Sequence, residues 1–280
     1  MAVVVGLLVA MAFGSGDFLG ARASQQASTI AVLFIAQLAA LAGALVVAFA
    51  VSSPITEHDL VYGAIAGSAN VIGLGLLYHA LSTGRMGTVA PVTAVVGASV
   101  PVAWGLLTGE RPSALVLVGV GCALVAGALL AREDSDDRTA DGRSAVLVAF
   151  AAGLGLGTSF IFFAKTSPDS GNWPVLWARA AAVVLVAVAV LVQRRRGEVA
   201  FPQGDARSLS LGAGGLDVLA TTLLLVALRR GLAVVVAPVA SLAPGMTVVL
   251  AWRVQRERIG RAQAVGLGLA GVGLVLIAAG

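Results

Sequence analysis

Charge is scarce in this sequence. Only 11% of its 280 residues are charged, whereas a soluble globular domain carries about a quarter. A soluble protein of this length could not cover its core with so little polar surface. A soluble fold is therefore excluded, and the chain is expected to lie in a lipid bilayer.

Cysteine and histidine are almost absent. The single cysteine, Cys122, lies in an apolar run, which excludes a disulfide framework. His58 and His79 have no metal-ligand spacing with other side chains, so we predict no metal and no cofactor. The first five residues contain no basic leader, which favours an initial membrane helix over a cleaved signal peptide.

Apolar residues make up most of the chain. They account for 59% of the chain, and the mean hydropathy is +0.97. The pI near 10.2 would suit nucleic-acid binding, but the arginines flank apolar runs, as basic residues do around membrane helices. We therefore predict no nucleic-acid partner.

Ten apolar runs approach the length of about twenty residues that a membrane helix needs. They cover approximately 2–20, 29–51, 59–82, 86–108, 113–131, 144–164, 173–193, 208–229, 232–252 and 261–279. The connector 132–143 between the fifth and sixth runs contains five of the fourteen acidic residues, which marks it as a linker.

The chain contains an internal repeat. Residues 80–131 match residues 227–278 without a gap, at a spacing of 147, with 17 of 52 pairs identical. Five helices per repeat is an odd number, so the second copy enters the membrane from the opposite side. We predict an all-α integral membrane protein with ten transmembrane helices in two inverted five-helix repeats, at 1–131 and 144–280.

The repeat also pairs polar residues. Asn70 corresponds to Asp217 at the same spacing, and Gln37 to Arg179 after a five-residue deletion. Ionisable groups within a span are costly and by default mark a site. Asp217 and Thr221 share one helix face, which would suit a coupling proton or a substrate ammonium. The alternative is a hydrogen-bonded Asp217 that joins two helices.

The other polar candidates also have two interpretations each. Arg179 would bind a substrate carboxylate or pair with Asp217, or it would snorkel to the interface. Asp17 follows Gly14-Ser15-Gly16, which permits close helix approach or the local unwinding that frames binding sites in inverted-repeat transporters. The alternative is that Asp17 lies at the interface and faces headgroup water. Gln37 and Asn70 line a site or hydrogen-bond between helices.

Four further residues receive a role from their position. Pro91, Pro238 and Pro244 fall inside apolar runs, where each would kink its helix, and we interpret them as shaping a cavity wall. Tyr78 lies near the end of its run, and we interpret it as an interfacial anchor.

Several motifs resemble the drug/metabolite transporter superfamily, in its EamA-type branch. They are Phe13–Gly20, Gln37, Tyr78–Gly84, Ala90-Pro91-Val92, Gly109–Pro112, Trp177-Ala-Arg179, Ala237-Pro238-Val239, Ser241–Pro244, Thr247 and Glu257-Arg258. The resemblance implies ten helices, alternating access by rocking of the halves, and a cavity lined by runs one, three, four, six, eight and nine. Many relatives have an arginine in run two, where this chain has Gln37.

The orientation of the termini has two competing predictions. Connectors after odd-numbered runs contain thirteen basic residues and those after even-numbered runs four. The positive-inside bias then puts both termini outside, whereas the resemblance implies cytoplasmic termini.

We therefore predict a secondary transporter, not an enzyme, that exports a small metabolite, amino acid or drug. Its surroundings would be the cell membrane, with the bacterial inner membrane favoured, and a homo-oligomer is compatible with the sequence. The alternatives are an intramembrane enzyme, with Asp17 and Asp217 as an acid pair, and a passive channel or lipid-handling scaffold.

Overall fold

The computed structural model describes residues 2–50, 53–82, 86–130, 142–197, 199–231, 233–240, 242–250, 253 and 260–279. The regular structure of these residues is helical. The helices are α1 (Ala2–Ser24), α2 (Thr29–Ala50), α3 (Glu57–Ser82), α4 (Met86–Leu107), α5 (Ala114–Leu130), α6 (Gly142–Ala164), α7 (Trp173–Arg195), α8 (Gly204–Arg230), α9 (Ala233–Ala240), α10 (Ala243–Leu250) and α11 (Arg261–Ala279).

The predicted run 232–252 differs from the others because it forms two helices. The helix α9 ends at Ala240 and α10 begins at Ala243. Pro244 therefore lies in the first turn of α10, where a proline interrupts no helical hydrogen bond, so the prediction of a kink inside a helix is wrong there. Pro238 lies inside α9 and is buried. Pro91 lies within α4, but its side chain is outside the described part of the structure.

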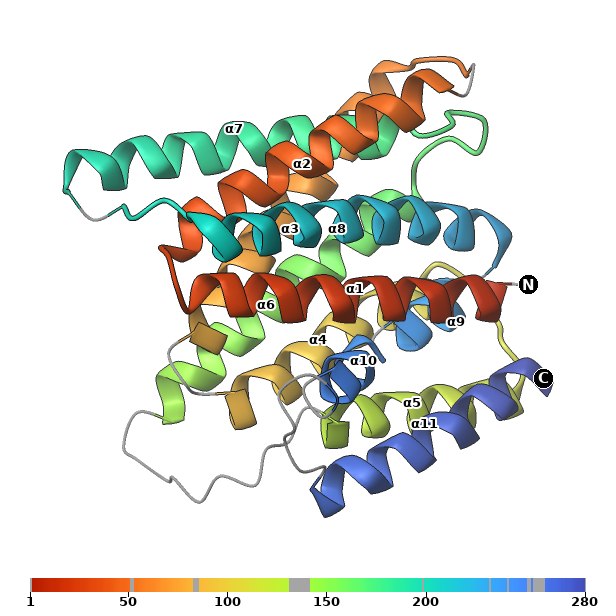
Figure 1. Ribbon diagram of the computed structural model, residues 1–280. Coiled ribbons are helices and arrows are strands. Elements are labelled where there is room, and N and C mark those ends of the chain that lie inside the picture. The colour runs from red at the N-terminus through yellow and green to blue at the C-terminus, as the bar shows by residue number, and fades with distance from the viewer. Residues whose placement is uncertain are drawn as a thin grey trace.

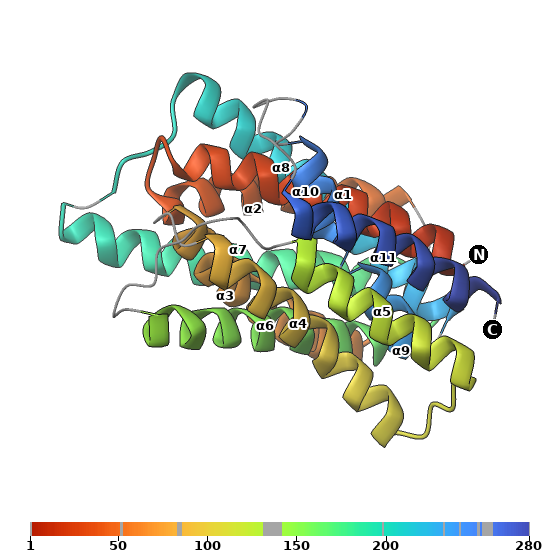
Figure 2. The ribbon, with the colours of Figure 1, turned by 90° about the horizontal axis from the view of Figure 1, so that it is seen from below.

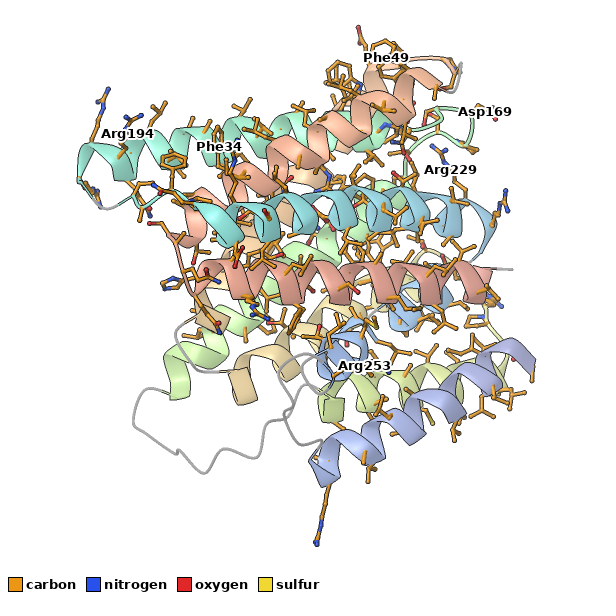
Figure 3. The ribbon with its side chains drawn as sticks, viewed as in Figure 1. Phe34, Phe49, Asp169, Arg194, Arg229 and Arg253 are labelled. Carbon is orange, nitrogen blue, oxygen red and sulfur yellow. The ribbon has the colours of Figure 1, made fainter. Side chains whose placement is uncertain are left out.

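The helices have the length and surface of membrane spans. Among the described residues, six helices are long and apolar enough to cross a bilayer, and three shorter apolar stretches lie in α4, α5 and α11. The large apolar side chain of Phe49 points outward (Figure 3), and both Phe49 and Leu191 are more than half exposed. Such a surface is stable against lipid and not against water. The chain is an all-α, multi-pass membrane protein, as predicted.

The helices of the two predicted repeats interleave (Figures 1 and 2). In the first half, α1 packs on α8 and α10, and α2 packs on α8. In the second half, the equivalent α6 packs on α3 and α4, and α7 packs on α3. We call α1, α2, α8, α9 and α10 the first packing group, and α3, α4, α6 and α7 the second packing group. The helices α5 and α11 lie side by side and pack on each other.

Equivalent glycines set the closest approach between these helices. A Cβ atom on Gly67 of α3 would overlap the carbonyl of Ala178 in α7, and one on Gly214 of α8 would overlap the carbonyl of Ala36 in α2. Gly67 and Gly214 correspond in the repeat. Small residues let membrane helices approach closely enough for extensive van der Waals contact. The two crossings are therefore equivalent. Each half supplies the glycine of one crossing and the partner helix of the other.

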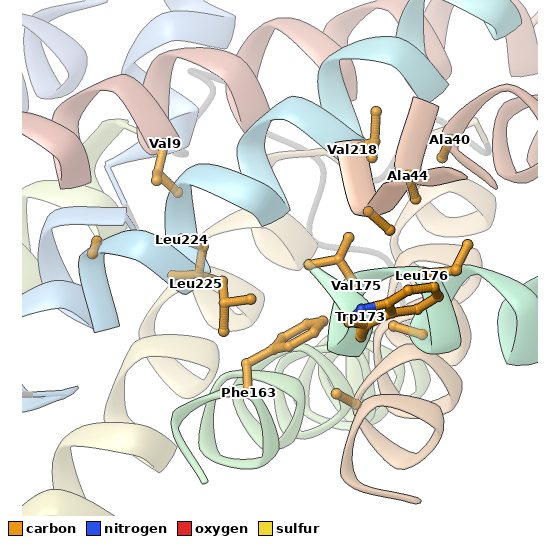
Figure 4. Packing of buried hydrophobic residues seen from close by; sticks show 14 of the residues in the cluster. Val9, Ala40, Ala44, Phe163, Trp173, Val175, Leu176, Val218, Leu224 and Leu225 are labelled. Atoms are coloured by element: carbon orange, nitrogen blue, oxygen red, sulfur yellow. The ribbon is translucent and has the colours of Figure 1, made fainter. Parts of the chain in front are cut away.

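Apolar packing fills the space around these crossings. Phe163, Trp173, Val175, Leu224 and Leu225 converge in one buried cluster (Figure 4). They come from α6, α7 and α8, and Val9 of α1 and Ala40 of α2 join them. The cluster therefore ties helices of both packing groups together at the centre of the molecule.

Different hydrogen bonds hold the connecting segments at the two ends of the molecule. At the end with both termini (Figure 1), the Ser167 amide donates to Asp59 at 2.7 Å, and the Trp173 indole donates to the Ser53 carbonyl at 3.2 Å. At the other end, where Arg194 lies (Figure 3), Ser28 and Ala200 exchange two hydrogen bonds. The predicted linker 132–143 lies almost entirely outside the described residues, and the repeat boundaries stay a prediction.

Candidate functional site

A buried ion pair lies in the middle of the bundle. The Arg179 Nη1 atom lies 2.6 Å from the Asp217 Oδ2 atom. Arg179 is 1% exposed, so its interpretation as a snorkelling residue is wrong and the pairing with Asp217 is correct. The pair joins α7 of the second packing group to α8 of the first.

Two uncharged side chains complete this network. The Gln37 carbonyl oxygen accepts a hydrogen bond from Arg179 Nη1 at 3.2 Å, and its amide donates to Asp217 Oδ2 at 3.5 Å. The Arg179 Nη2 atom donates to the Thr221 hydroxyl and, at 3.4 Å, to the Asp217 carbonyl. Thr221 in turn donates to that carbonyl at 2.8 Å. We call Arg179, Asp217, Gln37 and Thr221 the arginine network.

The arginine network shows why these polar residues tolerate the bilayer interior. A buried charge is costly unless it is paired and its remaining hydrogen-bonding capacity is used. Arg179 has one carboxylate, one amide, one hydroxyl and one backbone carbonyl as acceptors. Its Nε atom, however, is buried without a hydrogen-bond partner. The guanidinium is thus held firmly on the side of α2 and α8, with one donor unused.

Asp17 lies beside this network without belonging to it. Its helix α1 is continuous through Gly14 and Gly16, so these glycines serve close approach and not local unwinding. A Cβ atom on Gly16 would meet Leu216 and the Asp217 backbone in α8. Asp17 is half-buried and lies close enough to Asp217 for the two carboxylates to repel each other. Within the described residues, its carboxylate has no hydrogen bond or ion pair.

Tyr78 lies in the core rather than at the interface. It is 3% exposed, and its hydroxyl donates to the Gly16 carbonyl at 3.5 Å. The interpretation as an interfacial anchor is therefore wrong. A residue near the end of an apolar run faces the interface only if no neighbouring helix covers it, and here α1 covers Tyr78. Tyr78 is a neighbour of Asp17 that sequence reasoning missed.

Asn70 is the remaining candidate. It is 7% exposed, and its Oδ1 atom has no hydrogen-bond partner. It lies one turn after Gly67, at the crossing of α3 with the segment of α7 that carries Arg179. Asn70 and Arg179 therefore belong to the same helix crossing, although no hydrogen bond joins them in this conformation.

Two other features add nothing to the site. A pocket of about 260 Å³ between α4 and α5 is lined by Val95, Leu124, Val125, Ala128 and Leu129. Its lining is apolar and includes none of the predicted site residues. Among the described residues, no group of three potential metal ligands converges.

Comparison with known proteins indicates which protein family the chain resembles. The sequence model of the EamA-like transporter family matches residues 143–279. The second half of the chain belongs to this family. The resemblance to the drug/metabolite transporter superfamily is thereby confirmed, and EamA-like proteins are membrane transporters.

The fold of the whole chain also has a solved counterpart. A structure titled "Crystal structure of protein" superposes with a TM-score of 0.70 at 18% sequence identity, and the match covers 99% of this chain and 98% of that one. At this identity the likeness shows the fold alone. A comparison with curated proteins found no match.

Proposed function

We propose that this protein is a secondary transporter that exports a small metabolite, amino acid or drug across the cell membrane by alternating access. The observation that carries the proposal is the arginine network beside the half-buried Asp17, which has no partner among the residues that the structure describes. Ionisable groups at this depth are costly and mark substrate or ion pathways. A bacterial inner membrane is the proposed location.

The packing supports a particular kind of movement. Rocking of the two sequence halves would break nearly every major helix contact, because α1–α8, α3–α6 and α3–α7 all join one half to the other. The two packing groups contain these contacts within themselves. We therefore propose that the packing groups are the moving bodies, with the arginine network as a contact between them.

The carboxylates of Asp17 and Asp217 have different roles in this proposal. Asp217 is engaged by Arg179, and only 12% of its side chain is exposed. Asp17 has no hydrogen-bond or ion-pair partner in the part of the chain that the structure describes. Asp17 and the exposed edge of Asp217 would therefore receive the substrate or a coupling proton, while Gln37 and Thr221 hold Arg179 in place.

Growth rescue followed by counterflow exchange tests this function. A panel of toxic amino acids, analogues and drugs is applied to cells that express the protein, and protective compounds are then assayed for exchange in proteoliposomes. Asp17→Asn should reduce exchange roughly tenfold or more without lowering the melting temperature, because no contact is lost. Asp205→Asn, at the exposed start of α8, is the matched control and should exchange like wild type.

Two results would contradict the proposal. A wild-type protein that protects against no compound and exchanges none has no support as an exporter. Net flux without exchange would indicate a channel, because only a carrier couples the movement of labelled and unlabelled substrate.

A further inference from the structure

Arg179 has a second possible partner in the same crossing. Its Nε donor and the Asn70 Oδ1 acceptor are both buried, and neither has a hydrogen-bond partner within the described ranges of the chain. A buried, unsatisfied polar atom costs about as much as the hydrogen bond it lacks, and native structures contain few of them. Here a donor and an acceptor remain unused on neighbouring helices.

The repeat indicates that these two residues face each other. Gly67 and Gly214 form equivalent crossings, with Ala178 and Ala36 respectively. The polar residue after Ala36 is Gln37, which contacts Asp217, three residues after Gly214. By the same geometry, the polar residue after Ala178 faces the residue three positions after Gly67. Those two residues are Arg179 and Asn70.

The two partners of Arg179 belong to different packing groups. Asp217 lies on α8 of the first group, whereas Asn70 lies on α3, in the same group as α7. The contact with Asp217 therefore holds the two groups together. A contact with Asn70 would satisfy Arg179 within its own group and release the other.

We propose that Asn70 is the second position of Arg179, which the guanidinium occupies when the two packing groups separate during transport. Asn70 is thus a positioning residue that acts through Arg179, and this inference rests on the proposed function. Its amide suits the role because it accepts a hydrogen bond without adding a charge. A carboxylate there would hold Arg179 more strongly and oppose its return to Asp217.

The decisive variant is Asn70→Leu, which has a similar volume. In this conformation the Asn70 carbonyl has no partner, so its replacement by an apolar group should leave the melting temperature equal or higher. Exchange should nevertheless fall roughly tenfold to a hundredfold, the range for a lost hydrogen bond to a charged group. Thr222→Val is the matched control, because it also removes a buried polar atom, the Thr222 hydroxyl, that has no partner among the described residues. It should exchange like wild type.

A charge relocation tests the geometry without any transport assay. The double variant Asp217→Asn/Asn70→Asp moves the carboxylate from α8 to α3. It should recover at least half of the melting temperature that Asp217→Asn alone loses, because Arg179 can reach the relocated carboxylate.

The outcomes separate this inference from the proposed function. If Asn70→Leu exchanges like wild type, or the relocated carboxylate restores no stability, Asn70 is not a position of Arg179. If the wild-type protein exchanges no compound, the transport function fails, whereas recovery in the double variant still places Asn70 beside Arg179. Loss of stability in Asn70→Leu would show a structural role and overturn the inference.

Discussion

Replacing Asp217 with asparagine removes the only anion of the arginine network. The substitution leaves the size of the side chain almost unchanged and retains one acceptor oxygen. Arg179 also retains Gln37, Thr221 and the carbonyl of residue 217. What the variant loses is the charge that compensates a guanidinium that is 1% exposed.

The magnitude follows from the burial of the pair. Removing one partner of a buried ion pair costs about 3–5 kcal/mol. The three remaining acceptors favour the lower value, so we expect about 3 kcal/mol. For a chain of this size this corresponds to a melting temperature lower by roughly 6–12 °C.

A double-mutant cycle measures the interaction itself. Thermal unfolding in detergent is compared for wild type, Asp217→Asn, Arg179→Gln and the double variant. The double variant buries no unpaired charge, so it should be more stable than either single variant, with a coupling energy of roughly 2–3 kcal/mol. A loss below about 2 °C for Asp217→Asn, or additive losses in the cycle, would refute the assignment of a buried, energetically coupled pair.

Three further predictions follow from other contacts. Gly214→Ala should destabilise the protein by about 1–3 kcal/mol, because its methyl group would overlap the α2 backbone. The neighbouring Gly215→Ala meets open space and should be neutral or stabilising by up to about 1 kcal/mol. Equal melting temperatures for the two variants would contradict the close crossing. Arg229→Gln removes three hydrogen bonds to the connector 165–172 and should speed amide hydrogen exchange there by roughly tenfold, while the exposed Arg194→Gln should not. Thr247→Val removes the 3.0 Å hydrogen bond from α10 to the α1 backbone and should cost about 1 kcal/mol in thermal unfolding; an unchanged melting temperature would show that this contact is not formed.

Much of the fold could be predicted because the internal repeat can be recognised from residue matches in the sequence. The spacing of 147 residues relates Gly67 to Gly214 and Asn70 to Asp217, and the structure places these residues at equivalent crossings. The division of run 232–252 could not be predicted in the same way. Its first-half counterpart forms the continuous helix α4, so the repeat itself favoured an unbroken helix.

The site was predicted as a set of residues but not as a set of contacts. Arg179, Gln37 and Asp217 attract attention because polar residues are rare in the runs. Whether Arg179 pairs with Asp217 or reaches the interface depends on the angle at which α7 crosses α2 and α8, and no local pattern encodes that angle. Tyr78 was misplaced for the same reason, since the residue that covers it lies 62 positions away along the chain.

The interleaving of the helices has a consequence for biosynthesis. The helix α8 is the main packing partner of both α1 and α2, and α6 is that of α3. The ribosome makes both of these partners later. A nascent first half therefore enters the bilayer with the backbone of Gly67 and the amide of Gln37 facing lipid or provisional neighbours. Neither half is a folding unit, in contrast to proteins whose N-terminal domains fold as they emerge. The second packing group can assemble once α7 is made, whereas α1 and α2 acquire their main partner only with α8. Completion of α8 is thus the step at which the first packing group can begin to form and join the second.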